Sequence, residues 1–245
     1  MAVSFHLQFL KNIKLPAYRL EVTPDGDLEL EFTGPYESVV YWEVPALYIV
    51  NELYHRYTVR RAFSLETERN RYLLTGLSRL LDKIKRLSEY SELIFSDFGT
   101  RRRASRQWHD NSINLIAEQL PGQFRGTSNV YLAMKHNLVP TGTSAHQLFM
   151  VAAGLADLES NGNRDAIRAS HNEILAGWWK KFGFGLSIAL TDTWGTKHTF
   201  ETAPPEIATE WKGTRQDSGD PLRYGQKTLQ WYRRHGVDPK NKMIV

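Results

Sequence analysis

The chain has 245 residues, of which 41% are hydrophobic and 24% charged, with a formal net charge of +4. It contains no cysteine, which excludes disulfides, thiolate catalysis and cysteine-ligated zinc sites. The mild positive charge fits small anionic ligands better than nucleic acid, and the sequence shows neither a membrane-spanning apolar run nor a signal segment. We therefore expect a cytoplasmic protein that binds neither nucleic acid nor membrane.

The N-terminal part predicts a small α+β layer followed by a long helix. Residues 19–22 and 28–32 alternate in polarity on either side of an Asp-Gly turn, which is a strong hairpin signal. Residues 64–90 carry leucines and an isoleucine at helical spacing, and we expect this stripe to pack against the rest of the fold. The expected boundaries are a partial N-terminal α+β domain over 1–60 and a connecting helical segment over 61–91.

From Glu92 onward, strands and helices alternate. We expect strands at 93–96, 123–126, 138–141, 186–190 and 242–245, with helices between them. Repeated βα units imply a parallel sheet, open or closed into a barrel, with ligands at the carboxyl ends of the strands. The last strand has no crossover behind it, so we expect a partial α/β barrel over 92–245 that belongs to a larger domain or is completed by another chain.

The most informative motif is Asp-Phe-Gly-Thr-Arg-Arg-Arg at residues 97–103. With Thr100 as the N-cap, the arginines would occupy the first turn of a helix, where the helix dipole already presents positive potential. A glycine turn, a helix N-terminus and arginines together favour a phosphate or carboxylate site. The alternative is a solvated basic face that docks on an acidic segment.

Four further loops carry polar residues. Residues 126–129 (Gly-Thr-Ser-Asn) fit an anion site or a helix cap equally well. His146, behind the turn Gly142–Ala145, could be a base, a nucleophile, a phosphate contact or a structural residue, and Asp192 could orient a histidine or a metal or cap a helix. In residues 212–221, Asp220 and Pro221 predict a helix start, which leaves Arg215, Asp217 and Ser218 for a ligand that is anionic in one part and hydroxylated in another.

These five motifs, in this order and spacing, resemble those of the nicotinate phosphoribosyltransferase family. The resemblance implies the type II phosphoribosyltransferase fold, which is an irregular α/β barrel beside a mixed α/β domain, working as a homodimer. It implies that nicotinate and phosphoribosyl pyrophosphate give nicotinate mononucleotide and pyrophosphate, coupled to ATP hydrolysis with Mg²⁺ present. In that family the histidine that aligns with His146 is transiently phosphorylated by ATP.

The resemblance also implies roles for individual residues at one shared site. Thr143 and Arg215 would contact nicotinate, with Arg215 facing its carboxylate, and Phe98 would stack on the pyridine ring. Arg101, Arg102 and the neighbouring Arg103 would contact phosphates, and Asp217 and Ser218 would contact phosphates and ribose hydroxyls. Asp192 would orient His146.

Relatives carry an Asp-x-Tyr-Lys segment before the first residue of this sequence, and a Phe-Ser-Asp loop and a Gly-Thr phosphate loop after its last. Several relatives also have an acidic residue where this chain has Gln147. Because the phosphate loop binds phosphoribosyl pyrophosphate in those relatives, we expect little or no turnover by the 245-residue chain. The alternatives are a catalytically incompetent fragment that retains ligand-binding loops, and a nicotinamide-specific or quinolinate-specific relative.

Overall fold

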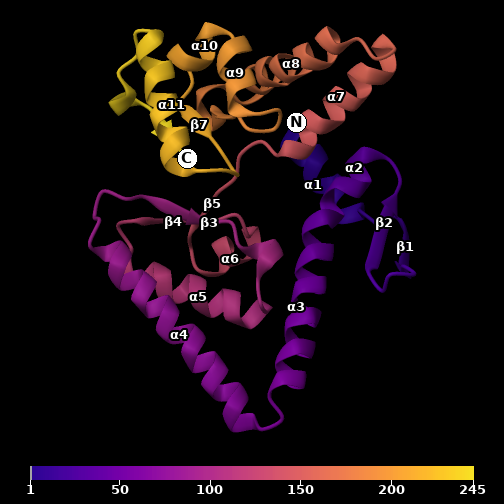
Figure 1. Cartoon of the computed structure of the whole chain (residues 1–245), viewed down its shortest axis with the longest axis vertical. Coiled ribbons are helices and arrows are strands. Elements are labelled where there is room, and N and C mark those ends of the chain that lie inside the picture. Colours follow the sequence, from indigo (N-terminus) through magenta and orange to yellow (C-terminus); the bar gives the residue numbers. More distant parts are fainter. Residues whose placement is uncertain (1) are drawn as a thin grey trace. The chain divides into compact units, whose positions relative to one another are not determined.

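The computed structural model describes residues 2–245, which form two compact units (Figure 1). The N-terminal unit ends at Thr141 and the C-terminal unit is Gly142–Val245. The helices and strands of the N-terminal unit are α1 (Ala2–Asn12), β1 (Ala17–Val22), β2 (Leu28–Thr33), α2 (Tyr36–Val39), α3 (Glu43–Ala62), α4 (Glu66–Ser88), β3 (Phe95–Asp97), α5 (Arg106–Gln119), β4 (Phe124–Thr127), α6 (Val130–Lys135) and β5 (Val139–Pro140), with short 3-10 turns at Val40–Trp42 and Thr100–Arg102.

The predicted N-terminal hairpin is confirmed. Strands β1 and β2 pair antiparallel in a register that runs from Ala17 opposite Thr33 to Val22 opposite Leu28. The turn between them places Gly26 at a φ of +86°, a conformation that glycine adopts at little cost. The Asp-Gly turn and the alternating polarity of the flanking residues both indicate a hairpin, which is why the sequence predicted it.

Helices α3 and α4 are the two long helices of the N-terminal unit, and in Figure 1 they run down to a common turn. The predicted helix over 64–90 is confirmed as α4. Its apolar stripe, however, is buried at Ile84 and exposed at Leu73, Leu77 and Leu81 among the described residues. The expectation that the whole stripe packs is therefore wrong, because exposed leucines occur in both halves of the helix.

The first parallel sheet has the strand order β3-β4-β5, and its core contains Ile113, Phe124 and Leu132. Gly126 brings β4 close to β5, because a Cβ at this position would lie 1.9 Å from the carbonyl oxygen of Val139. The strand after α4 begins at Phe95, and the preceding Leu93 and Ile94 are exposed. An apolar run alone thus placed the start of this strand two residues too early.

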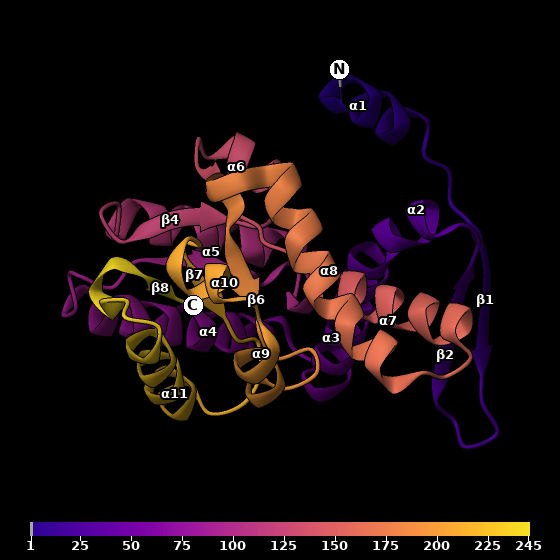
Figure 2. The same cartoon turned by 90° about the horizontal axis from the view of Figure 1, so that it is seen from above.

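The C-terminal unit contains the second parallel sheet, with the order β6-β7-β8. Its elements are α7 (His146–Ser160), α8 (Arg164–Phe182), β6 (Ile188–Leu190), α9 (Thr196–Thr202), α10 (Pro205–Thr209), β7 (Gly213–Arg215), α11 (Pro221–Arg234) and β8 (Met243–Ile244), with 3-10 turns at Gly183–Leu186 and Pro239–Asn241. Helices α7 and α8 lie side by side (Figure 1, Figure 2). Parallel strands alternating with helices confirm the expected incomplete α/β fold.

The core of the C-terminal unit is large and aromatic. It is built from Phe149, Leu175, Ala189, Leu190, Ile207, Ala208, Trp211, Trp231 and Tyr232. Helix α11 starts as predicted, because the Asp220 carboxylate accepts hydrogen bonds from the N–H groups of Leu222 and Arg223, with Pro221 at the first helical position. Within residues 2–245, no helix combines the length and apolar character needed to cross a bilayer.

One buried histidine in this core is not part of any predicted site. His171 of α8 is fully buried beside the ring of Phe149, with ring centroids 4.8 Å apart. The side chain of Asn172 and the backbone of Leu190 approach the ring, but neither ring nitrogen forms a hydrogen bond of good geometry. Burial therefore lowers the pKa of His171 below its ordinary value of 6.5.

A lowered pKa in the folded state makes stability depend on pH. As the pH falls through the ordinary histidine pKa of 6.5, His171 takes up a proton in the unfolded chain but not in the folded one. The folded state therefore loses stability relative to the unfolded state. We expect His171 to contribute a loss of at most about 1.4 kcal/mol between pH 7.5 and 5.5. Urea unfolding at both pH values should show a smaller loss for His171→Leu than for the wild type, and equal losses would contradict this.

Candidate functional site

The predicted site residues lie at or after the carboxyl ends of strands. Phe98, Arg101 and Arg102 follow β3 in the N-terminal unit. The other six are in the C-terminal unit: Thr143, His146, Asp192, Arg215, Asp217 and Ser218. Thr143 and His146 follow β5, the last strand of the first sheet, whereas Asp192, Asp217 and Ser218 follow β6 and β7 of the second sheet.

The three arginines do not begin an α-helix. Thr100–Arg102 forms a 3-10 turn, Arg103 is extended, and α5 begins at Arg106. The N-cap is Ser105, whose hydroxyl accepts a hydrogen bond from the Trp108 N–H. The prediction that Thr100 caps this helix is therefore wrong, because a serine five residues later satisfies the same requirement immediately before the first turn.

Helix α3 contacts two of the three arginines of this turn. Arg101 forms a 2.7 Å ion pair with Glu43, and the Arg103 guanidinium lies 4.2 Å from the centroid of the Tyr48 ring. Arg103 also lies 3.8 Å from Glu52. Among residues 2–245, the exposed Arg102 is the member of the three for which the structure shows no partner, so it is the one free to meet an anion.

A buried hydrogen-bond network fixes the turn that carries Phe98. Asp97 Oδ2 accepts hydrogen bonds from His109 Nε2 (2.8 Å) and Thr127 Oγ1 (2.7 Å), and Asp97 Oδ1 accepts one from the Gly99 N–H (3.0 Å). Burial opposes ionisation of Asp97, but these bonds outweigh it and hold the pKa of the carboxyl below its ordinary value of 3.8. Phe98, half exposed, is therefore presented from a rigid turn.

The Gly126–Asn129 loop serves structure in this unit. The Asn129 side chain accepts a hydrogen bond from the Leu132 N–H and so caps α6. Thr127 Oγ1 accepts from the Asn129 N–H while it donates to Asp97. Of the two interpretations of this loop, the structure favours the helix cap.

In the C-terminal unit, His146 lies at the centre of the predicted residues. Its Nε2 is 3.2 Å from Asp217 Oδ2 and 3.7 Å from Asp192 Oδ1, and its Nδ1 is 2.9 Å from Thr193 Oγ1. About a third of the ring is exposed. A partly open imidazole between two carboxylates and a hydroxyl can exchange protons or accept an electrophile.

Asp192 holds the loop that follows β7 through hydrogen bonds. Its Oδ2 accepts three hydrogen bonds, from the N–H groups of Asp217 and Ser218 and from Ser218 Oγ. Its Oδ1 is buried and, within the described chain, has no hydrogen-bond partner. Asp192 thus fixes residues 217–218, and Asp217 is the carboxylate nearer to His146.

Arg215 ends β7 and is joined to the same cluster. Its Nη2 donates to Asp217 Oδ2 at 3.0 Å, and its Nε lies 2.9 Å from Asp217 Oδ1 without hydrogen-bond geometry. The Arg215 side chain is only 11% exposed. Thr143, by contrast, donates to the backbone of Ser144 and makes no described contact with the cluster.

Two contributors were not singled out from the sequence. In the sequence, Thr193 is the last residue of the segment Leu-Thr-Asp-Thr at the end of a predicted strand. Asp97 is the first residue of the arginine motif. Nothing in the sequence shows that Thr193 meets a histidine 47 residues earlier.

No group of three or more histidine, aspartate or glutamate side chains suited to a metal ion occurs among residues 2–245.

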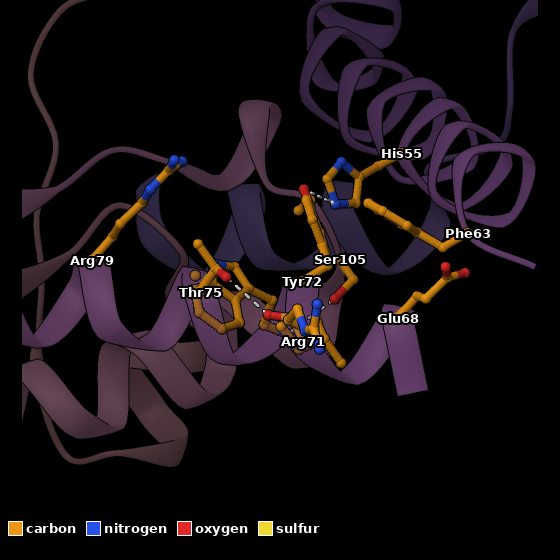
Figure 3. Close-up of a pocket in the computed structure, with 12 residues that line it drawn as sticks. His55, Phe63, Glu68, Arg71, Tyr72, Thr75, Arg79 and Ser105 are labelled. Carbon is orange, nitrogen blue, oxygen red and sulfur yellow. Dashed lines mark hydrogen bonds between the residues drawn. The ribbon is translucent and has the colours of Figure 1, made fainter. Parts of the chain in front are cut away.

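The N-terminal unit also has a cavity of about 460 Å³ between α3, α4 and the start of α5 (Figure 3). Figure 3 shows Tyr72 and His55 joined across it by a hydrogen bond of 3.0 Å. Trp108 forms part of the wall and fits against α4 because position 76 is glycine, where a Cβ would lie 3.2 Å from the indole. None of the predicted site residues lines this cavity.

We expect Asp97→Asn to destabilise the chain by about 1–3 kcal/mol, because the amide presents a donor where the carboxylate accepts three hydrogen bonds. Urea unfolding at pH 7 measures the change. The matched control is Asp82→Asn on the exposed surface of α4, which should change stability by less than about 0.5 kcal/mol. Equal effects of the two substitutions would show that the network contributes nothing.

Comparison with known proteins shows the family and the fold. The nicotinate phosphoribosyltransferase (NAPRTase) family model matches residues 93–245. A crystal structure of nicotinate phosphoribosyltransferase from Vibrio cholerae aligns with a TM-score of 0.79 and 27% identity over 98% of this chain and 55% of that protein. The enzyme from Porphyromonas gingivalis gives a TM-score of 0.79 at 24% identity over 98% of this chain and 57% of its own, which supports the fold.

The chain therefore spans a little over half the length of these two proteins. All nine predicted site residues fall within the region that the family model matches. The resemblance drawn from the five motifs is confirmed, and the chain belongs to the nicotinate phosphoribosyltransferase family.

Proposed function

We propose that this chain carries the histidine and the base-binding loops of a nicotinate phosphoribosyltransferase. The reaction joins nicotinate to phosphoribosyl pyrophosphate, releases pyrophosphate and forms nicotinate mononucleotide, the first step of NAD salvage from nicotinate. The observation that carries the proposal is the position of His146, between Asp217, Asp192 and Thr193 and within the family match.

His146 is the proposed acceptor of the γ-phosphoryl group of ATP. A ring nitrogen attacks phosphorus, the bond from phosphorus to the bridging oxygen breaks, and ADP leaves. The carboxylates beside Nε2 stabilise the positive charge that the ring gains in this step. Release of the phosphoryl group as phosphate restores the free histidine, which completes the coupling to ATP hydrolysis.

Arg215 is the proposed contact for the carboxylate of nicotinate. The guanidinium is nearly buried, and Asp217 occupies only part of its donor set. A second carboxylate can therefore pair with the remaining N–H groups, where low exposure strengthens the interaction. Phe98 offers a half-exposed ring for stacking on pyridine, and Thr143 offers a hydroxyl.

Arg101 and Arg102 are the proposed phosphate contacts. Arg102 is unpaired within residues 2–245, whereas Arg101 would first have to leave Glu43. Asp217 and Ser218 would contact ribose hydroxyls and phosphates. Mg²⁺ is usually held by one or two carboxylates together with substrate phosphates, and Asp192, with a buried unpaired oxygen, and Asp217 fit that pattern.

A homodimer is part of the same proposal. The exposed faces of α3 and α4 carry many large apolar side chains, among them Leu53, Tyr54, Tyr57, Leu73 and Leu74. Apolar patches of this kind mark surfaces that bind other protein surfaces. The competing hypothesis is a chain that retains ligand-binding loops without catalysing the reaction, and it is consistent with the partial coverage of the solved relatives.

Incubation with ATP should place an acid-labile phosphate on His146, detected by mass spectrometry of peptides prepared at alkaline pH. His146→Gln should abolish the label. His136→Gln is the matched control and should retain it, because His136 is held by Asp110 in the N-terminal unit. No phosphate on the wild-type chain at saturating ATP would leave only the ligand-binding hypothesis.

Arg215→Gln should weaken nicotinate binding about 10- to 100-fold, because it removes charge-assisted hydrogen bonds worth about 1.5–3 kcal/mol. Calorimetry with nicotinate and with nicotinamide measures the effect, and the affinity for nicotinamide should change little. Arg223→Gln, on the exposed surface of α11, is the control. Equal binding of the two ligands by the wild-type chain would contradict Arg215 as the carboxylate contact and favour a nicotinamide-specific relative.

A further inference from the structure

Both ring nitrogens of His146 face side chains whose hydrogen-bonding capacities differ. Nε2 faces two carboxylates, Asp217 at 3.2 Å and Asp192 at 3.7 Å, and Nδ1 faces the Thr193 hydroxyl at 2.9 Å. A carboxylate only accepts hydrogen bonds, whereas a hydroxyl both donates and accepts. The two sides of the ring are therefore not equivalent.

This difference determines where a neutral ring carries its proton. Asp192 Oδ1 is buried and has no hydrogen-bond partner in the described chain, so a lone pair on Nε2 beside it would be repelled. A proton on Nε2 removes that repulsion and leaves the lone pair on Nδ1. The Thr193 hydroxyl then donates to Nδ1.

Thr193 is held in place by its neighbours in the loop between β6 and α9. Thr191 is buried, and its N–H donates to the carbonyl of Arg215 at 3.0 Å. The Gly195 N–H donates to the carbonyl of Asp192 at 3.2 Å, which closes a turn around Thr193. Gly195 has a φ of +94°, which other residues rarely adopt. The hydroxyl therefore approaches the ring from a fixed backbone.

We propose that Thr193 is a positioning residue that holds His146 in the Nε2–H tautomer, with the lone pair on Nδ1. The proposal rests on the proposed role of His146 as the acceptor of a phosphoryl group, since it assigns the nucleophilic lone pair to Nδ1, from which the Thr193 hydroxyl must withdraw when phosphorus approaches. Without the hydroxyl, only the carboxylates on the Nε2 side contact the ring. It can then turn about its Cβ–Cγ bond and exchange its proton between the two nitrogens.

The test is a long-range ¹H–¹⁵N correlation spectrum of the chain with ¹⁵N-labelled histidine, recorded at a pH where His146 is neutral. His146→Gln identifies the signals of this ring among the eight histidines of the chain. The wild type should show a protonated Nε2 and an unprotonated Nδ1. Thr193→Val should move the ¹⁵N chemical shifts of Nδ1 and Nε2 toward each other, as expected for a mixture of tautomers. Thr193→Ser should restore the wild-type shifts.

Thr202→Val is the matched control, because this exposed threonine of α9 donates to the carbonyl of His198 and should leave the His146 signals unchanged. The signals of the other histidines report whether each variant is folded. A wild-type ring protonated on Nδ1, or unchanged shifts in a folded Thr193→Val, would overturn the proposal. The spectrum needs no ATP, so a chain that shows these shifts but takes no phosphate from ATP would contradict the proposed function and not the assignment of the tautomer.

Discussion

Each unit depends on one carboxylate that lies at the carboxyl end of a short parallel strand and accepts three hydrogen bonds. Asp97 collects its donors from Gly99, His109 and Thr127, and so joins β3, α5 and β4. Asp192 collects its donors from Asp217 and Ser218, and so joins the loops after β6 and β7. Strands of three or four residues form few ladder bonds, and these two side chains supply the missing connections at the sheet edges where the predicted ligand residues lie.

Arginine side chains of the candidate site are likewise paired with carboxylates of the same chain. Three arginines in consecutive positions suggested that an external anion must neutralise them, but α3 supplies Glu43 and Glu52 for two of the three. Arg215 is likewise paired with Asp217. The chain therefore balances most of the charge of its candidate site internally. At Arg102, an incoming anion would displace no carboxylate of residues 2–245.

Local signals made part of this structure predictable. The hairpin around Gly26, the long helix α4 and the Asp220–Pro221 start of α11 each follow from side chains within a few residues of one another. Strand β7 has only Gly213, Thr214 and Arg215, too short a run for a periodic pattern, and it was missed. Ser105 and Thr100 satisfy the same capping rule, and only the backbone distinguishes them. The contacts of His146 with Thr193 and Asp217 join residues far apart in the chain, which one sequence cannot show.

One oxygen links the parts of the C-terminal cluster. Asp217 Oδ2 lies 3.0 Å from Arg215 Nη2 and 3.2 Å from His146 Nε2, so a guanidinium and an imidazole share it. A carboxylate has one negative charge to divide between them, and a stronger interaction with one partner weakens its interaction with the other. We therefore expect a more positive His146 ring to draw Asp217 away from Arg215 and to leave the guanidinium more available to another anion. This linkage is reciprocal, because an anion bound to Arg215 in turn leaves Asp217 more available to stabilise a charged ring.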